Sequence, residues 1–275
     1  MGDSSGLPAK AVFIRQLSGP LAKEWNACKQ SDSLCLYYEI DGLRRILHDL
    51  SHPDAINYRE LAGDRYVPLG SMQFVPFGSV EFTQEYCKQM GIVLPPNFSY
   101  GVHPGQLDEF LLRRVTRHPY DDVANDRFIK PVKLKLFDAG KKADITNSAY
   151  HINPDVWASK FVQLGAEFRY YIHKGKILGW CRYDALNEDY PDPDHKLVEA
   201  IVSKINATSD AVPIAYSVDI GYRVDLDRYC LVEMNDFWSL GWYTYKDSQS
   251  KPITAEQYAQ AVVDRWLQIS TPLIP

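Results

Sequence analysis

The sequence has few cysteines, and their spacing gives them no paired role. The five cysteines are odd in number and widely separated, and they include no Cys-x-x-Cys. This spacing excludes a disulfide framework and gives no support to a zinc site. We expect buried or incidental thiols in a protein of a reducing compartment.

The chain also lacks an excess of basic residues and any long apolar run. Its 275 residues carry a formal net charge of -5, which gives no general attraction to nucleic acid or to an anionic membrane. No segment approaches the roughly 18 apolar residues that a membrane span needs. The N-terminal "MGDSSGLPAK" lacks the apolar core of a secretion signal. We therefore expect a cytoplasmic protein that binds neither nucleic acid nor membranes.

Three common nucleotide-site motifs are missing. The sequence contains no G-x-x-x-x-G-K-[ST], no G-x-G-x-x-G and no K-x-D-G. These absences exclude a P-loop NTPase, a simple Rossmann dehydrogenase and a nucleic-acid ligase of the nucleotidyltransferase kind. What the sequence does have is 45% hydrophobic and 13% aromatic residues, enough for a substantial core.

The hydrophobic pattern changes near residue 127, from mixed helix and strand to mainly strand. Before this point, the pattern predicts strands at 11–16 and 34–40, and helices at 20–30, 80–90 and 106–117. After it, the predicted strands are 127–137, 156–162, a hairpin over 167–184, 215–225 and 228–235. Two later helices begin at Asp194 and at a capping box of Thr254 and Gln257. The order of elements predicts an α/β (α+β) fold.

The last two predicted strands carry the most informative polar residues. Alternation places Asp219 on one face of its strand with Ser217, whereas Glu233 and Asn235 share one face of the next strand, opposite Met234 and Cys230. An antiparallel hairpin would bring Asp219, Glu233 and Asn235 together. Their oxygens are the type of ligand that Mg²⁺ accepts. The same alternation also fits carboxylates that merely face solvent, and it does not choose between the two.

The run "EMNDFWSLG" at 233–241 resembles the end of the core of the ATP-grasp superfamily. In that family, an E-x-N on the last strand and an acidic residue on the strand before it bind the metals that bridge the phosphates of ATP. The segment "SVDIG" at 217–221 fits the second element. The resemblance therefore implies Mg²⁺ ligation by Asp219, Glu233 and Asn235. It runs from about Gly70 to Leu267.

Within this superfamily, the chain looks like a divergent clade recognised by Arg and Lys signatures. That clade includes a eukaryotic cell-division-cycle protein that helps to assemble an initiation factor, and many bacterial and phage proteins. By resemblance, Lys130 in its F-I-K-P context contacts nucleotide phosphate, and Lys135 in "KLFDAG" is a second phosphate lysine. The long Gly/Ser-rich phosphate loop of better known ATP-grasp enzymes is missing after Lys135.

The segment "SKFVQLGAEFR" at 159–169 resembles the hinge of the family. By resemblance, Lys160, Phe161 and Val162 lie beside the adenine, and Glu167 binds ribose hydroxyls. Arg169 would reach the phosphates or an acylphosphate, for which a planar bidentate donor is well suited. A cross-strand ion pair with a hairpin neighbour is the alternative role for Glu167 or Arg169.

The resemblance also implies a domain plan and a function. Residues 1–120 would form an N-terminal pre-ATP-grasp subdomain and 121–275 the core, with a lid lobe at about 127–165, a C-terminal lobe at about 166–275, and the nucleotide between them. The expected activity is a Mg-ATP-dependent carboxylate-amine ligase acting through an acylphosphate, with a protein or peptide as one candidate substrate. The alternatives are an ATP-binding assembly module without turnover and a kinase-like phosphotransferase. The sequence does not identify the carboxylate or the amine.

Overall fold

The computed structural model describes most of the chain from residue 91 onward. Before that point it describes 11–16, 59–61, 73–76, 80, 83–84 and 87–88. It then describes 91–103, 105–145, 153–184, 189–207, 212–243 and 248–270. The helix expected at 20–30 and the strand expected at 34–40 lie outside these residues, as do Cys28 and Cys35. The three cysteines inside them, Cys87, Cys181 and Cys230, are buried free thiols as expected.

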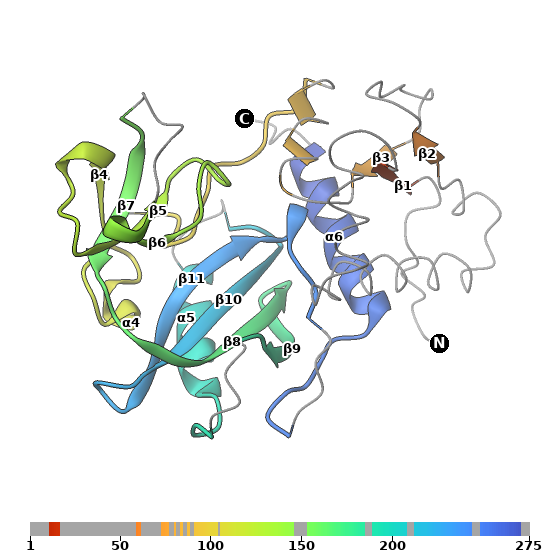
Figure 1. Cartoon of the computed structure of the whole chain (residues 1–275). Helices are drawn as coiled ribbons and strands as arrows, with labels where there is room; N and C mark the ends of the chain where they lie inside the picture. Colours follow the sequence, from red (N-terminus) through yellow and green to blue (C-terminus); the bar gives the residue numbers. More distant parts are fainter. Residues whose placement is uncertain are drawn as a thin grey trace.

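The N-terminal strands form a small parallel sheet. Its order is β2-β1-β3, with β1 at Ala11–Gln16, β2 at Arg59–Leu61 and β3 at Gln73–Pro76. The strand expected at 11–16 is therefore confirmed. This sheet lies beside α6 (Ala255–Ser270) in Figure 1.

A four-stranded antiparallel sheet follows, which we call the small sheet. Its order is β4-β7-β5-β6, formed by Thr116–Pro119, Asp155–Lys160, Arg127–Pro131 and Gly140–Lys141. A compact apolar cluster covers one face of this sheet and contains Tyr120, Val123, Ile129, Val156 and Ala158. Tyr120 begins the short helix η1 (Tyr120–Asp122), and Val123 directly follows it. The opposite face carries Lys130 beside Trp157.

The second four-stranded antiparallel sheet, the large sheet, has the order β11-β10-β8-β9. Its strands are β8 (Leu164–His173), β9 (Lys176–Arg182), β10 (Ala215–Arg223) and β11 (Arg228–Asp236). Helix α5 (His195–Asn206) lies behind the sheet in Figure 1 and packs on one face through Val198, Ile201, Val202 and Ile205. The polar residues of the large sheet therefore lie on the face opposite α5. The mixed helix and strand content confirms the α/β (α+β) class.

Several local predictions are confirmed by the turns and helix caps. The β8–β9 hairpin turns at Lys174 and Gly175, whose φ values of 51° and 71° suit a tight turn. Asp194 caps α5 by accepting from the Leu197 N–H at 3.1 Å. Thr254 and Gln257 exchange the two hydrogen bonds of a capping box before α6. None of the helices in the described part of the chain is both long enough and apolar enough to span a membrane.

The helix expected at 106–117 is wrong for most of its length. Only α4 (Asp108–Leu111) is helical, Leu112 turns left-handed at φ 49°, and Thr116–Pro119 is strand β4. Tertiary contacts overcome the helical composition, because Arg113 donates to main-chain carbonyls of β11 and Arg117 pairs with Asp155 of β7.

Another boundary differs from the pattern, and one agrees with it. The strand expected at 127–137 ends at Pro131, which has no N–H to continue the ladder, and Lys135 adopts φ 60° in the following turns. Within the helix expected at 80–90, residues 80, 83–84 and 87–88 are helical. Gly91 then follows with a φ of 68°, as a residue just past a helix end should.

Candidate active site

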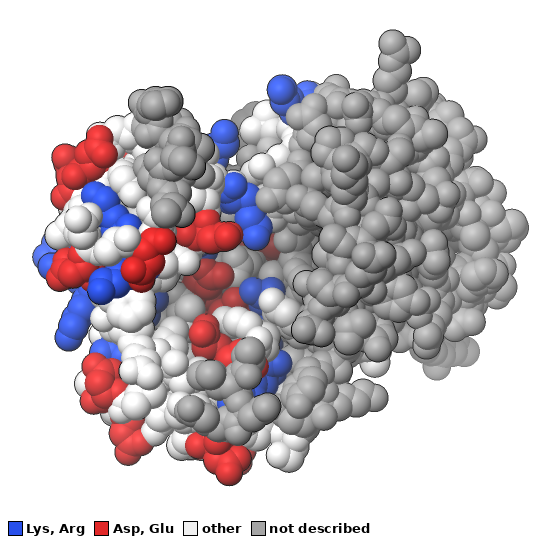
Figure 2. All heavy atoms as spheres, viewed as in Figure 1, with Lys and Arg blue, Asp and Glu red and all other residues white. Residues whose placement is uncertain are grey.

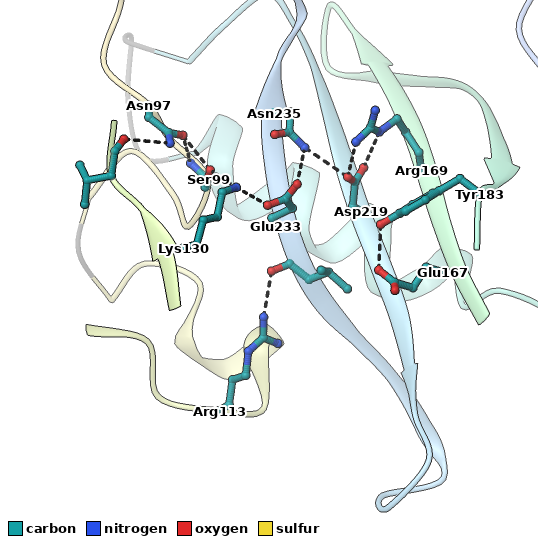
Figure 3. Close-up of polar contacts among 12 residues, drawn as sticks. Asn97, Ser99, Arg113, Lys130, Glu167, Arg169, Tyr183, Asp219, Glu233 and Asn235 are labelled. Atoms are coloured by element: carbon teal, nitrogen blue, oxygen red, sulfur yellow. Dashed lines mark hydrogen bonds and ion pairs between the residues drawn. The ribbon is translucent and has the colours of Figure 1, made fainter. Parts of the chain in front are cut away.

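A row of polar side chains crosses the face of the large sheet opposite α5. Asp219 on β10 is paired with Glu233 of β11 on one side and Arg169 of β8 on the other. Glu167 lies opposite Gly221. Figure 3 shows these side chains directed toward one another. The alternation predicted for Glu167, Arg169, Asp219, Glu233 and Asn235 is therefore correct.

Asp219 and Arg169 form a buried two-point ion pair. Arg169 donates from Nε to Oδ1 at 3.0 Å and from Nη2 to Oδ2 at 2.7 Å, and Asp219 is 0% exposed. The guanidinium also lies over the rings of Tyr183 and Tyr243, 5.5 and 5.0 Å from their centroids. Burial raises the pKa of Asp219, and the guanidinium opposes that rise. A buried carboxylate is thus compensated by a cation held in a fixed orientation.

Lys130 reaches the row from the small sheet. Its Nζ donates to Glu233 Oε2 and, at 2.9 Å, to Ser99 Oγ. Ser99 in turn donates to Asn97 Oδ1 at 2.7 Å. Burial alone would raise the pKa of Glu233, but the Lys130 ammonium and the Asn235 amide hold it below its usual range. The Lys130–Glu233 ion pair therefore joins the two sheets and keeps Glu233 ionised.

Asn235 links the two carboxylates. Its Nδ2 donates to Asp219 Oδ2 at 3.2 Å and to Glu233 Oε1 at 3.0 Å. A half-turn of the carboxamide would present Oδ1 to the same space. These hard oxygens fit Mg²⁺, which uses one or two carboxylates and takes its other ligands from phosphate and water. Among the described residues there is no group of three or more His, Cys, Asp or Glu side chains that could hold a metal ion.

A β-bulge fixes which residues of β11 join the row. Asp219 pairs with Glu233, but Ile220 pairs with Leu231, so Val232 is an extra residue. The expectation that Cys230 shares a face with Met234 is therefore wrong, because Cys230 lies opposite Gly221, on the side of Asp219, and Met234 lies opposite Val218. The bulge lets both Leu231 and Met234 join the core while Glu233 and Asn235 face the site.

Glu167 sits at the end of the row beside β9. Its Oε2 accepts from the Tyr183 hydroxyl at 2.9 Å, and its backbone N–H donates to Asp184 at 2.9 Å. Burial raises the pKa of Glu167 to about 7, and the carboxylates of Asp219, Asp184 and Glu233 add to the rise. Glu167 is therefore a group that titrates near neutral pH.

The remaining predicted residues lie apart from this row. Residues 161–163 connect β7 of the small sheet to β8 of the large sheet, as Figure 1 shows, so Lys160, Phe161 and Val162 occupy the link between the sheets. Phe161 is 49% exposed, and Lys160 and Lys135 are also exposed. In the described part of the chain, no hydrogen bond or ion pair connects these four residues to the row.

Sequence reasoning missed the contribution of the segment before α4. Ser99 accepts from Lys130, and its carbonyl accepts from the Met234 N–H at 2.8 Å, so this segment lies against the outer edge of β11. No spacing in "PPNFSYG" at 95–101 signals that role. Tyr183 was also missed, although its position at the end of the predicted hairpin beside Glu167 could have suggested it.

On the face in view, Figure 2 shows charged side chains of both signs spread over the described part of the chain. This mixture agrees with the net charge of -5.

Comparison with known proteins gives one family and a set of similar folds. The family model described as an ATP-grasp domain, family 2 of the R-two-K clade, matches residues 110–252. The crystal structure of the D-cycloserine synthetase DcsG is similar, at 12% identity over 93% of this chain and 99% of that chain, with a TM-score of 0.50. At this identity the likeness shows the fold alone.

Two further structures are similar at lower TM-scores. The D-alanine–D-alanine ligase of Bacillus anthracis has 12% identity over 94% of this chain and 98% of that chain, with a TM-score of 0.49. Cdc123 of Schizosaccharomyces pombe has 16% identity over 35% of this chain and 40% of that chain, with a TM-score of 0.23. No curated protein sequence matches.

Proposed function

This chain belongs to family 2 of the R-two-K clade of ATP-grasp domains, and from this premise we propose that it is a Mg-ATP-dependent ligase that activates a carboxylate for attack by an amine. The observation that carries the proposal is the row on the large sheet. Two carboxylates and an amide meet there, and each carboxylate is already paired with a cation, Lys130 or Arg169. Lysine and arginine side chains of this kind can bind phosphate groups when a nucleotide is present.

The nucleotide would bind between the small and large sheets. We place adenine beside Lys160, Phe161 and Val162, because they form the link between the sheets. The ribose would lie near Glu167 and the triphosphate over the row. Lys130 and Arg169 would then exchange carboxylate oxygens for phosphate oxygens, and Lys135 would approach from the turns after β5.

Asp219, Glu233 and Asn235 are the residues that would hold Mg²⁺. When bound there, the ion would neutralise part of the negative charge of the phosphates. In the ligand-free protein Asp219 is held by two nitrogens of the Arg169 guanidinium, which fixes the position of its carboxylate before the nucleotide binds. The Glu233 side chain is 24% exposed, so its carboxylate would remain accessible to an ion that arrives with the phosphates.

The chemistry assigned to the chain is acyl activation followed by amide formation. A carboxylate oxygen of the substrate attacks the γ-phosphorus, the bond to the β–γ bridging oxygen breaks, and ADP leaves. The amine nitrogen then attacks the acyl carbon and loses a proton, and phosphate leaves with the former carboxylate oxygen. Lys130 and Arg169 would stabilise the negative charge on the transferred group, because each would by then lie against phosphate oxygens.

The first experiment is calorimetric titration of ATP with and without Mg²⁺. We expect micromolar or tighter binding with Mg²⁺, and its loss in a folded variant with Glu233→Ala and Asn235→Ala. The matched control is Glu199→Ala with Asn206→Ala, two exposed residues of α5 that leave the row intact. A wild-type protein that binds no nucleotide, or a control that loses binding equally, would contradict the site.

Product analysis then separates the ligase from its alternatives. Amide formation together with ADP and phosphate supports the ligase. A stable phosphorylated product would identify a phosphotransferase instead. Tight Mg-ATP binding without turnover across panels of carboxylates and amines, including peptides, would indicate an assembly module.

A further inference from the structure

Arg113 connects the segment after α4 to the bulged strand β11. Its Nη1 donates to Leu231 O and its Nη2 to Val232 O, both at 3.0 Å, and Nη1 also donates to Leu111 O at 3.2 Å. Figure 3 shows the guanidinium reaching β11 beside the row of polar residues. No carboxylate pairs with Arg113 in the described part of the chain, and besides the main-chain oxygens its half-buried guanidinium meets Cys230 Sγ at 3.9 Å and the Tyr100 hydroxyl.

The two carbonyls of β11 belong to the bulge itself. Val232 is the extra residue between the pairs Ile220–Leu231 and Asp219–Glu233. A bulge leaves part of the ladder unpaired, and buried carbonyls without donors cost free energy. The guanidinium of Arg113 supplies donors to two successive carbonyls at this point, and so stabilises the bulged conformation against a regular one.

The bulge decides whether the site exists. Side chains alternate along a strand, so a shift of one residue turns every following side chain to the other face. With the bulge, Glu233 and Asn235 lie opposite Asp219 and Ser217 while Leu231 faces the core. A regular strand cannot satisfy both requirements, because Leu231 and Glu233 would then share a face.

We propose that Arg113 is a positioning residue that locks the bulge at Val232 and so places Glu233 and Asn235 for the metal-bound nucleotide. The role in nucleotide binding rests on the proposed function, whereas the role in holding β11 does not. Arginine is required because its planar fork donates to both carbonyls at once. Lysine keeps the charge, but its donors all lie on one nitrogen, so it cannot place two separate nitrogen atoms on the two carbonyls as the guanidinium does.

The test compares Arg113→Lys with Arg223→Lys. Arg223 is buried and donates to a carbonyl of the same segment after α4, Leu112 O at 3.0 Å, but it ties that segment to the end of β10 rather than to the bulge of β11, and it pairs with Asp225. It therefore controls for a general loss of stability. Arg113→Met extends the series, and Arg113→Lys keeps the test available if the methionine variant does not fold.

Two readouts are measured on each variant. The first is amide hydrogen exchange of the ligand-free protein, where we expect faster exchange across 229–236 in Arg113→Lys and not in Arg223→Lys. The second is the Mg²⁺ concentration that half-saturates ATP binding, where we expect a rise of about 10-fold or more for Arg113→Lys, typical of losing a group that orients metal ligands. Arg223→Lys should leave this concentration unchanged.

The outcomes separate this inference from the proposed function. Unchanged exchange across 229–236 in Arg113→Lys overturns the positioning role, whatever the protein binds. Faster exchange with an unaltered Mg²⁺ dependence, or one altered equally in Arg223→Lys, overturns the link to the metal site. Faster exchange in a protein that binds no ATP at all supports the lock on β11 and refutes the proposed function instead.

Discussion

Asp236 and Arg265 form a buried two-point ion pair between the end of β11 and α6. Arg265 donates from Nε to Oδ1 at 2.7 Å and from Nη2 to Oδ2 at 2.6 Å. The Asp236 side chain is 9% exposed and the Arg265 side chain is 6% exposed. Asp236 directly follows Asn235, and it also accepts from the Trp238 N–H at 3.3 Å. The pair therefore fastens the strand that carries Glu233 and Asn235 to the C-terminal helix.

Arg265→Met should unfold the protein far more easily. It leaves the Asp236 carboxylate buried without its cation, and breaking a buried pair in this way costs about 3–5 kcal/mol. The free energy of unfolding in urea measures the loss. Lys204→Met is the control, because Lys204 and Glu109 form an exposed pair expected to contribute about 1 kcal/mol or less. Equal losses in the two variants would show that the Asp236–Arg265 pair is not a structural anchor.

Gly221→Ala should destabilise the protein through the bulge. A Cβ at Gly221 would lie 2.9 Å from Val232 Cγ2 and 3.2 Å from Leu164 Cδ1. Overpacking of this kind costs about 1–3 kcal/mol. Gly140→Ala is the matched control, because its Cβ would meet nothing within 4 Å. Thermal unfolding measures both, and a melting temperature of Gly221→Ala as high as that of Gly140→Ala would contradict the close packing of Val232 over Gly221.

Glu167→Gln should change how stability depends on pH. The folded pKa of Glu167 is raised from 4.5 to about 7 by burial, so the folded state holds the proton more tightly than the unfolded chain. The stabilisation is fully present below the unfolded pKa and is lost as pH rises through the folded pKa. By linkage, the wild type loses up to about 3 kcal/mol from this group between about pH 4.5 and 7.

Glutamine cannot titrate, so Glu167→Gln should remove that slope. Urea unfolding of the wild type and of the variant across this pH range gives the difference directly. Parallel curves for the two proteins would mean that Glu167 titrates near its ordinary pKa.

Lys130 and Glu233 should be energetically coupled. The stabilities of Lys130→Met, Glu233→Gln and the double variant form a mutant cycle, and groups in one network couple by about 0.5–3 kcal/mol. The double variant should lose less than the sum of the single losses, because each single change leaves a partly buried partner unpaired. Additive losses would show that the ion pair contributes nothing between the sheets.

The alternation of side chains along a strand gave correct predictions where the strands are regular, and the β8–β9 turn could be predicted because it depends only on neighbouring residues. The hairpin around Lys174 and Gly175 could be predicted because both residues suit a tight turn. The grouping of Asp219 with Glu233 and Asn235 followed from alternation on either side of a short connection. These arguments need only neighbouring residues, which the sequence contains.

The errors arise where distant residues decide the conformation. The bulge at Val232 has no local signature, and it depends on Gly221 across the ladder and on Arg113 more than a hundred residues earlier. The segment 106–117 has helical composition, but contacts with β7 and β11 turn most of it away from helix. No pattern within a single segment can report such contacts, because they exist only once the sheets have formed.

The ion pair between Lys130 and Glu233 has a kinetic consequence. Lys130 belongs to the small sheet and Glu233 to the large sheet, so the ligand-free protein is already latched across the surface to which we assign the triphosphate. Under the proposed function, the latch must open before ATP can take Lys130, and opening is a first-order event that ATP concentration does not accelerate. The observed association rate should therefore level off at high ATP, and weakening the latch should hasten entry even where it lowers the final affinity.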